Sequence, residues 1–243
     1  MAEPLFRLDR VGHDARDGTP ALRAISTTID SGERVVVLGP NGSGKSTLLH
    51  LLNGLVLPDT GRWWFRGVPV DRRRLRDRAW TAGLRRTMAL MFQQPEAMLF
   101  NPTVREEIGF GLRHLEAADR DARIALWAQR LGLGDRLDRA PVDLSGGERQ
   151  RLCLASLLAP EPSILLLDEP TANLDPPTTG WLLDWLHAAD CTTITATHHL
   201  GDAAELGERA LILGHHHELL HDGPLAAALA DPALLRRAGL ARR

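Results

Sequence analysis

The sequence has 243 residues, of which 44% are hydrophobic and 25% charged, and its formal net charge is -2. This balance is typical of a globular protein with a sizeable core, and it gives no indication of nucleic-acid binding. The two cysteines, Cys153 and Cys191, lie far apart and outside any CxxC pair, which argues against a disulfide framework or a zinc site and favours a reducing cytoplasm.

In chain order, the first predicted elements belong to a small antiparallel sheet. Residues from about 4 to 33 and from 60 to 70 contain strand-like pieces, at 24–29 and 62–68, that glycines and prolines interrupt. The apolar run 35–38 between them instead has the continuous β-branched character of a buried strand in a parallel sheet.

A glycine-rich segment follows this buried strand and opens a helical pattern, STLLHLLNG. It matches the phosphate-loop motif G-x-x-x-x-G-K-[ST] in the strand-to-helix context that the motif needs. The glycines let backbone N–H groups converge on a phosphate, while Lys45 reaches the β- and γ-phosphates and Ser46 ligates Mg²⁺. A plain glycine-rich turn is the alternative, which the Lys-Ser-Thr ending disfavours. The predicted loop comprises Gly39, Pro40, Asn41, Gly42, Ser43, Gly44, Lys45, Ser46 and Thr47.

After a further apolar strand at 88–92, residues from about 96 to 160 predict an inserted helical subdomain, with strong helix formers at 120–131. A second glycine motif, LSGGERQR, lies near its end. Ser145 and Glu148 have the spacing of a capping box, so a simple helix start is one interpretation.

The glycines of this motif favour a second function. Gly146 and Gly147 expose backbone N–H groups at the first helical turn, which is typical of an anion site. One nucleotide cannot easily use two phosphate sites on the same chain. The two halves of each composite site are therefore expected to come from different subunits.

The apolar strand 164–167 ends in two carboxylates, Asp168 and Glu169. Carboxylates at the carboxyl end of a parallel strand face the ligand crevice. Asp168 is predicted to hold Mg²⁺, and Glu169 is predicted to polarise the attacking water as general base. Two surface acids are the alternative, which the neighbouring phosphate loop disfavours.

The last predicted strands are 192–196 and 210–213, and the Ala- and Leu-rich tail after Asp222 predicts a short terminal helix. Alternating strands and helices favour an α/β fold. We therefore predict one domain over 1–243, with a P-loop NTPase core around a mainly parallel sheet, a small antiparallel β subdomain and an inserted α-helical subdomain.

Together, GPNGSGKST, LSGGE and LLLDEPTANLD resemble the motifs of the ABC ATPase family, and the resemblance covers nearly the whole chain. In that family two cassettes pair head-to-tail, and the LSGG of one closes over ATP held by the phosphate loop of the other. The resemblance implies ATP and Mg²⁺ as cofactors, and a second ABC ATPase subunit, identical or different, as partner.

Three further residues take roles only through this resemblance. Gln93 matches the Q-loop glutamine, which contacts Mg²⁺ or the attacking water and links the core to the helical subdomain. The segment 172–175, which ends in Asp175, resembles the D-loop at the dimer interface, and His198 matches the switch histidine that senses the γ-phosphate. Taken alone, Gln93 and His198 would be polar residues at strand ends.

The adenine platform departs from the family pattern. Most cassettes place an aromatic residue, often Tyr, before the segment that is 18–22 here, and this chain has no Tyr. Ala15 stands near that position. Either stacking on adenine is weak, or the nearby His13 substitutes for the missing ring.

Two other stretches have simpler interpretations. The arginine-rich segment 72–86 predicts a solvated helix face, with anionic lipid or a partner protein as the alternative contact. The three histidines at 215–217 predict a surface turn rather than a metal site, because no spaced acid or cysteine completes a ligand set.

The segment FQQPEAMLFNPTVREEIGFG is similar to the energy-coupling-factor and cobalt/nickel branch of importer ATPases, although it has Met98 where many relatives have Gln. The branch implies uptake of a transition-metal ion or a vitamin through a multi-span transmembrane subunit. No stretch approaches the roughly 20 apolar residues of a membrane-spanning helix, and the start MAEPLFRLDR lacks a secretion signal's apolar core. We therefore expect a cytoplasmic chain, held on the inner face of the membrane by its partner.

The alternative function is a soluble ABC ATPase that acts on nucleic acid or ribosomes. Relatives of that kind insert coiled coils or zinc modules, or carry two cassettes in one chain, and the sequence shows neither feature. A small-molecule kinase would leave LSGGE unexplained. The favoured prediction is an ATPase that powers an importer, with no nucleic-acid partner. Met98, Leu99 and Phe100 are then either buried in the helical subdomain or part of a groove for a helix of the membrane partner.

Overall fold

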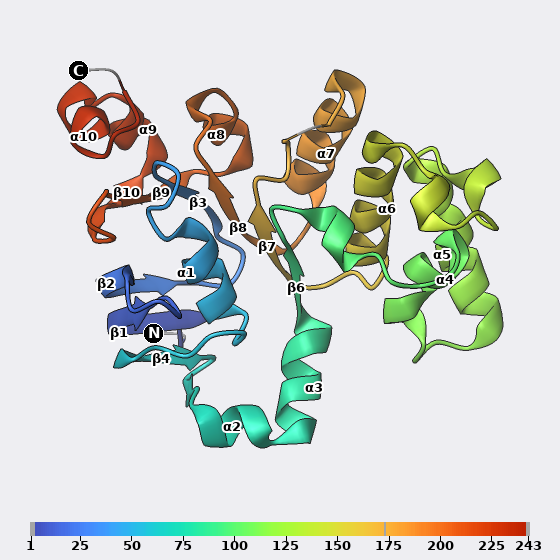
Figure 1. Cartoon of the computed structure of the whole chain (residues 1–243), viewed down its shortest axis with the longest axis horizontal. Coiled ribbons are helices and arrows are strands. Elements are labelled where there is room, and N and C mark those ends of the chain that lie inside the picture. Colours follow the sequence, from blue (N-terminus) through green and yellow to red (C-terminus); the bar gives the residue numbers. More distant parts are fainter. Residues whose placement is uncertain (1–2, 173, 242–243) are drawn as a thin grey trace.

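The computed structural model describes residues 3–172 and 174–241, and within these ranges the chain forms two β-sheets with helices packed around them (Figure 1). The larger sheet contains β3 (Arg34–Leu38), β6 (Met88–Met91), β7 (Ile164–Asp168), β8 (Thr192–Thr197), β9 (Arg209–Leu213) and β10 (Leu219–Pro224). Its strand order is β10-β9-β3-β8-β7-β6. All neighbouring strands are parallel except β10, which is antiparallel to β9. The predicted α/β fold with a mainly parallel sheet is therefore confirmed.

The smaller sheet is antiparallel, as predicted. It contains β1 (Phe6–Asp14), β2 (Pro20–Ile29), β4 (Thr60–Phe65) and β5 (Val68–Pro69), in the order β2-β1-β4-β5. The predicted strand 62–68 is wrong as one element, because a tight turn divides it into β4 and β5. Arg66 and Gly67 form that turn with positive φ angles of 48° and 71°, the backbone that two-residue hairpins favour.

Most helices lie in the connections between strands, and two follow the last strand, β10. Those outside the region 96–160 are α1 (Lys45–Leu52), α2 (Arg72–Arg76), α3 (Arg78–Thr87), α7 (Pro176–Ala188), α8 (Leu200–Leu206), α9 (Leu225–Leu229) and α10 (Pro232–Arg237). Those largely within it are η1 (Pro95–Met98), α4 (Val104–Gly109), η2 (Phe110–Leu112), α5 (Ala117–Arg130), η3 (Gly134–Arg136), η4 (Pro141–Asp143) and α6 (Gly146–Leu158).

Both faces of the larger sheet are buried, which explains the continuous apolar runs of its strands. Along β3, Val35 and Val37 pack in a cluster with α1 and the antiparallel sheet. The intervening residues, Val36 and Leu38, pack on the other face with α6, α7 and α8. Every residue from Val35 to Leu38 is consequently buried, and the strand that leads into the phosphate loop is rigidly held.

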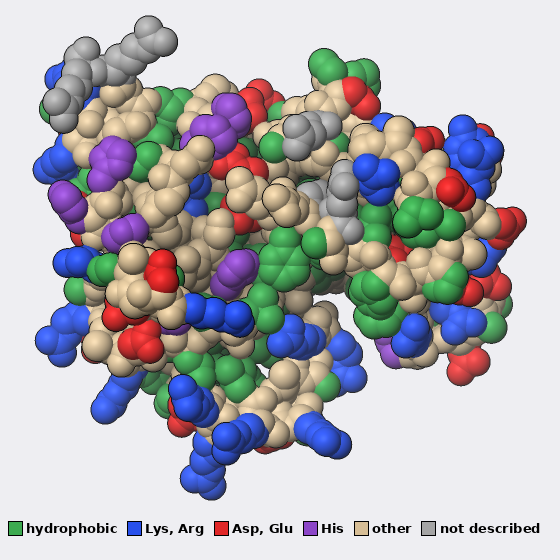
Figure 2. All heavy atoms as spheres, in the orientation of Figure 1, with side chains coloured by type: hydrophobic (Ala, Val, Ile, Leu, Met, Phe, Trp, Pro, Cys, Tyr) green, Lys and Arg blue, Asp and Glu red, His purple; other side chains and the backbone are tan. Residues whose placement is uncertain are grey.

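Three local features differ from or complete the prediction. β10 was not predicted, because its half-exposed sequence LLHDGP lacks an apolar run. The tail forms two helices rather than one, since Asp231 caps a second helix that begins at Pro232. The arginines of α2 and α3 are largely exposed at one end of the molecule (Figure 2), while Asp71 and Asp77 cap the two helices, as expected for a solvated face.

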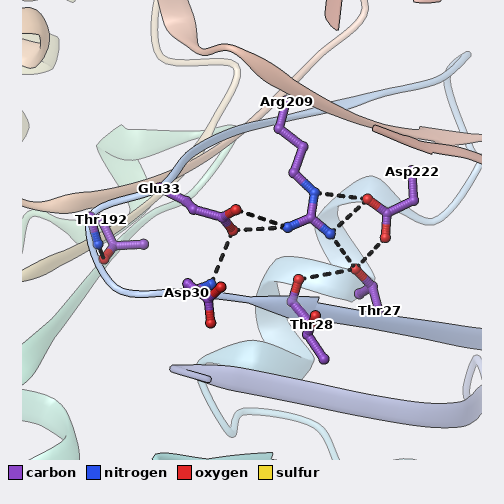
Figure 3. A network of polar contacts seen from close by, with 8 residues as sticks. Thr27, Thr28, Asp30, Glu33, Thr192, Arg209 and Asp222 are labelled. Carbon is purple, nitrogen blue, oxygen red and sulfur yellow. Dashed lines mark hydrogen bonds and ion pairs between the residues drawn. The ribbon is translucent and has the colours of Figure 1, made fainter. Parts of the chain in front are cut away.

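An ion-pair network joins the two sheets (Figure 3). Arg209 on β9 lies 2.9 Å from Glu33 and 2.7 Å from Asp222 on β10, measured between guanidinium nitrogens and carboxylate oxygens. The Thr27 hydroxyl on β2 donates a 2.7 Å hydrogen bond to Asp222. These side chains are only about a quarter exposed, so the network fixes β2 of the small sheet against β9 and β10.

Candidate nucleotide site

The carboxyl ends of the parallel strands meet at one edge of the larger sheet, where α/β proteins bind ligands. A pocket of about 380 Å³ opens there. From the phosphate loop it is lined by Asn41, Gly42, Gly44, Lys45, Ser46 and Thr47. Gln93 after β6, and Asp168 and Glu169 at the end of β7, also line it.

The phosphate loop curls because of its glycines. Gly44 precedes α1 in a left-handed conformation, and a Cβ there would collide with the carbonyl oxygen of Ala21. A Cβ on Gly39 would lie 2.5 Å from the Ser43 hydroxyl. Side chains at either position would push the loop away from β2 and β9, so the motif requires glycine for close packing as well as for phosphate approach.

Lys45 lines the pocket and is buried. Its ammonium group donates hydrogen bonds to the carbonyl oxygens of Gly39, at 2.8 Å, and Pro40, at 3.1 Å. Burial lowers the pKa of Lys45, and the charges of Glu169 and Asp168 partly oppose this shift. A cation held between the loop and two carboxylates is suited to a polyphosphate with its metal ion.

The Asp168 carboxylate is buried and is hydrogen-bonded to the phosphate loop. Burial raises its pKa, and a hydrogen bond from the Ser46 hydroxyl partly counteracts that rise. The Ser46 hydroxyl, the Asp168 carboxylate and the Gln93 amide are oxygen donors of the kind that Mg²⁺ prefers. These residues therefore fit the predicted magnesium site.

Glu169 is fixed in place by three donors. Its Oε2 accepts a 3.0 Å hydrogen bond from the Thr197 hydroxyl. Its Oε1 accepts from the backbone N–H of His198 at 3.1 Å and lies 2.6 Å from the His198 Nδ1. The residue has a left-handed backbone with φ 51°, a conformation that costs energy and is common at functional sites. The end of β8 thus holds the predicted general base at the pocket. Ligand atoms of Glu169, His198 and the neighbouring His199 also lie close enough together to hold a metal ion.

The second glycine motif forms the start of α6. Ser145 and Glu148 make the predicted capping box, with Glu148 accepting from the Ser145 N–H at 2.8 Å. Backbone and side-chain hydrogen bonds from Ser145 lower the pKa of Glu148. Ser145 and Gly146 are exposed and do not line the pocket of their own chain. The structure therefore does not bring the two predicted phosphate sites of one chain together.

Two contacts connect this helix to the segment that follows Glu169. Gln150 donates a 2.6 Å hydrogen bond to the carbonyl oxygen of Ala172. Arg151 lies 3.3 Å from Asp175, whose carboxylate also caps α7 by accepting from the Thr178 N–H. Asn173 lies outside the described residues. Asp175 is half-exposed at the surface, and its predicted role at a dimer interface stays a prediction.

The part of the pocket near the predicted adenine platform differs from the expectation. Ala15 lines it, together with Thr19, Pro20 and Ala21. His13 does not line the pocket, and its Nδ1 lies 3.0 Å from a carboxylate oxygen of Asp59. The proposed substitution of His13 for the missing aromatic residue thus finds no support.

Sequence reasoning missed His217, which lines the same pocket. It was assigned to a surface turn, and it does lie in the turn between β9 and β10. Its position shortly after the apolar run 210–213 was the available signal, because the end of each parallel strand approaches the ligand edge. Within residues 3–172 and 174–241, no helix combines the length and the apolar character needed to cross a bilayer.

Comparisons with known proteins identify the family of this chain. The profile described as ABC transporter matches residues 22–172. The nickel import ATP-binding protein NikO of Rhodobacter capsulatus is 40% identical over 245 residues, which cover 98% of this chain and 96% of that protein. The structure of cbiO1 from Clostridium perfringens, described as part of the ABC transporter complex cbiONQ, has a TM-score of 0.78 and 29% identity, with 98% and 95% of the two chains covered.

A second solved structure is the ATP-binding cassette MJ0796, described as a dimer in a post-hydrolysis state bound to ADP and Pi. It has a TM-score of 0.81 and 27% identity, with 90% of this chain and 98% of that chain covered. These findings confirm the resemblance and the fold class predicted from the motifs. The chain belongs to the ABC transporter family, as an ATP-binding subunit in which ATP hydrolysis is coupled to transport.

Proposed function

We propose that this chain powers an importer for a transition-metal ion or a vitamin, on the cytoplasmic face of the membrane, through a multi-span transmembrane subunit. The names of the relatives NikO and cbiO1 support this branch. Nothing in the described part of the chain resembles the coiled-coil or zinc insertions of repair ATPases, so the nucleic-acid alternative is not favoured.

An apolar groove at the amino end of β6, separate from the nucleotide pocket, carries the proposal. The groove has a volume of about 480 Å³ and lies between β6 and the helices of the region 96–160. Its lining includes Met98, Leu99, Phe100 and Phe110, which follow Gln93 in the chain. A movement at Gln93 would therefore reach the groove through a short connection.

The residues of the 98–100 segment differ in exposure, which bears on the two interpretations. Met98 and Leu99 are half-buried and pack against the main core. Phe100, in contrast, is 65% exposed. Its ring makes an edge-to-face contact with the exposed Phe110, with 4.8 Å between the ring centroids. An exposed aromatic pair in an apolar groove is suited to binding an amphipathic helix.

A buried carboxylate holds this surface in shape. Glu107 on α4 is 3% exposed, and its Oε2 accepts hydrogen bonds from the backbone N–H groups of Phe100, at 3.0 Å, and Asn101, at 2.7 Å. The loop is thus tied to the helical region rather than free. Because the groove is lined by both β6 and the end of α4, a movement of α4 relative to β6 would change its width.

The proposed chemistry assigns one task to each side of the pocket. The phosphate loop and Lys45 bind the phosphates, and Mg²⁺, when bound at Ser46, Asp168 and Gln93, supplies charge neutralisation on the phosphate oxygens. Glu169 orients the attacking water and accepts its proton. His198 positions Glu169 through the 2.6 Å contact between its Nδ1 and the Glu169 Oε1.

We further propose a head-to-tail dimer. Ser145, Gly146, Gly147 and Glu148 do not line their own chain's pocket, and Ser145 and Gly146 are exposed, so they are available to the nucleotide of a second subunit. The dimeric state described for MJ0796 supports this arrangement. The second subunit is either a copy of this chain or a related cassette.

The groove is tested with Phe100→Asp. The variant is expected to fold and to bind ATP, because Phe100 is exposed and makes no contact with the pocket, but to lose co-purification with the membrane subunit and metal or vitamin uptake in cells. The matched control is Leu126→Asp, which introduces the same charge at an exposed position of α5 outside the groove and is expected to keep both activities. A folded Phe100→Asp protein that assembles and transports normally would contradict the proposed docking surface.

A further inference from the structure

The turn after β9 contains His217, a residue without an assigned role that lines the nucleotide pocket. The ends of β3, β6, β7 and β8 carry the phosphate loop, Gln93, the Asp168–Glu169 pair and His198. The fifth parallel strand, β9, ends at the same edge and is followed by His217, which lines the pocket. Ligands of α/β sheets are bound by residues at these strand ends, so His217 is a candidate contact.

The backbone holds His217 firmly at that place. Its N–H donates a 3.1 Å hydrogen bond to the carbonyl of Gly214, and its carbonyl accepts one of 2.8 Å from the N–H of Arg23 on β2. Its φ of 66° is left-handed, a conformation uncommon outside glycine. The bond to Arg23 joins the turn to the strand that also brings Pro20 and Ala21 into the pocket.

The surroundings indicate which part of the nucleotide lies there. The phosphate loop, Asp168, Glu169 and Gln93 form the part of the pocket suited to phosphates and metal. The rest of the lining comes from Ala15, Thr19, Pro20 and Ala21, none of which has an aromatic or imidazole ring. His217 is joined to this second group through β2, and of the described lining residues it is the one with such a ring.

The ring also has unused bonding capacity. The residue is half-buried, and its Nδ1 is shielded from solvent without a hydrogen-bond partner among the described residues. A buried polar atom without a partner is costly. Imidazole rings both stack on bases and hydrogen-bond to them.

We propose that His217 contacts the nucleoside part of ATP and sets the affinity and base selectivity of this cassette. It would take the place of the aromatic side chain that is missing near Ala15. The contact is supplied by the β9–β10 turn instead of the segment before β2. The proposal concerns nucleotide binding by the chain itself, so it does not depend on the transported substrate or on the membrane partner.

The test compares nucleotides with a phosphate chain that has no nucleoside. His217→Asn and His217→Gly both remove the ring and tolerate a left-handed backbone. Calorimetric titration of the full chain with Mg-ATP, Mg-GTP and Mg-tripolyphosphate is expected to show about 10-fold weaker ATP binding in both variants, in line with the loss of one base–ring contact. The preference for ATP over GTP should shrink, and binding of tripolyphosphate should not change.

His216→Ala is the matched control, because His216 lies in the same turn but is exposed and does not line the pocket. Melting temperatures without nucleotide establish that the variants are folded. Unchanged ATP affinity in both His217 variants would overturn the proposal. An equal loss of affinity for ATP and tripolyphosphate would also overturn it, since His217 would then act at the phosphate end.

Discussion

Replacement of Glu169 by glutamine tests whether this residue activates water without being needed for binding of the nucleotide and the metal. Glu169 accepts hydrogen bonds from the Thr197 hydroxyl, the His198 N–H and the His198 ring. A glutamine can keep its oxygen toward the two His198 donors and turn its amide toward the Thr197 oxygen, which accepts hydrogen bonds as well as donating them. We therefore expect Glu169→Gln to fold with little loss of stability.

The electrostatic consequences at the metal site favour retained binding. The charge of Glu169 contributes to raising the pKa of Asp168, after the larger effect of burial. Removing that charge lowers the pKa of Asp168, so its carboxylate stays ionised to a lower pH and remains available to Mg²⁺. The same change weakens the electrostatic support of the Lys45 ammonium, whose pKa burial already lowers. Binding of Mg-ATP is thus expected to change by no more than a few-fold at neutral pH.

The rate of hydrolysis should fall much further. Loss of a positioned general base typically costs about 10²–10⁴-fold in rate, so steady-state phosphate release by Glu169→Gln should lie in that range below the unmodified protein. Because ATP is bound and not consumed, size-exclusion chromatography with saturating Mg-ATP should show a dimer. Glu205→Gln, an exposed change on α8, is the matched control with unchanged turnover. Turnover at the unmodified rate, with a monomer under saturating ATP, would refute the role of Glu169.

Two further predictions follow from the same structure. Lys45→Ala and Ser145→Arg should each abolish hydrolysis, but a mixture of the two variants should recover part of it. The reason is that each mixed head-to-tail pair has one composite site with both elements intact. If heterodimers form and no activity returns, the composite sites do not work independently. Arg209→Met leaves the part-buried Glu33 and Asp222 without their cation. The free energy of unfolding should fall by about 2 kcal/mol, a value between those of exposed and buried ion pairs. The melting temperature should fall by roughly 4–8 °C. Adding Asp222→Asn should restore part of that loss, and an unchanged melting temperature of Arg209→Met would show that the network is not stabilising.

The local parts of this protein were predictable from the sequence. The phosphate loop, the capping box at Ser145 and the strand that ends at Asp168 depend on residues within a few positions of one another. Short-range sterics and hydrogen bonds decide such elements, so their residue types appear in a fixed order and spacing. The parallel core was predictable for a related reason, since burial on both faces requires continuous apolar runs.

Packing between distant segments decided the rest. The Thr27 hydroxyl bonds to Asp222 across 195 positions, and no local period encodes that contact. The partner of His13, the exposure of Phe100 beside the half-buried Met98 and Leu99, and the placement of His217 in the pocket likewise depend on how the sheets and helices pack. The surroundings of a side chain depend on the elements that pack against it. The sequence near that residue does not specify which elements these are. The sequence alone therefore predicted the phosphate chemistry, while the tertiary structure decided which further residues line the pocket and which apolar side chains are exposed.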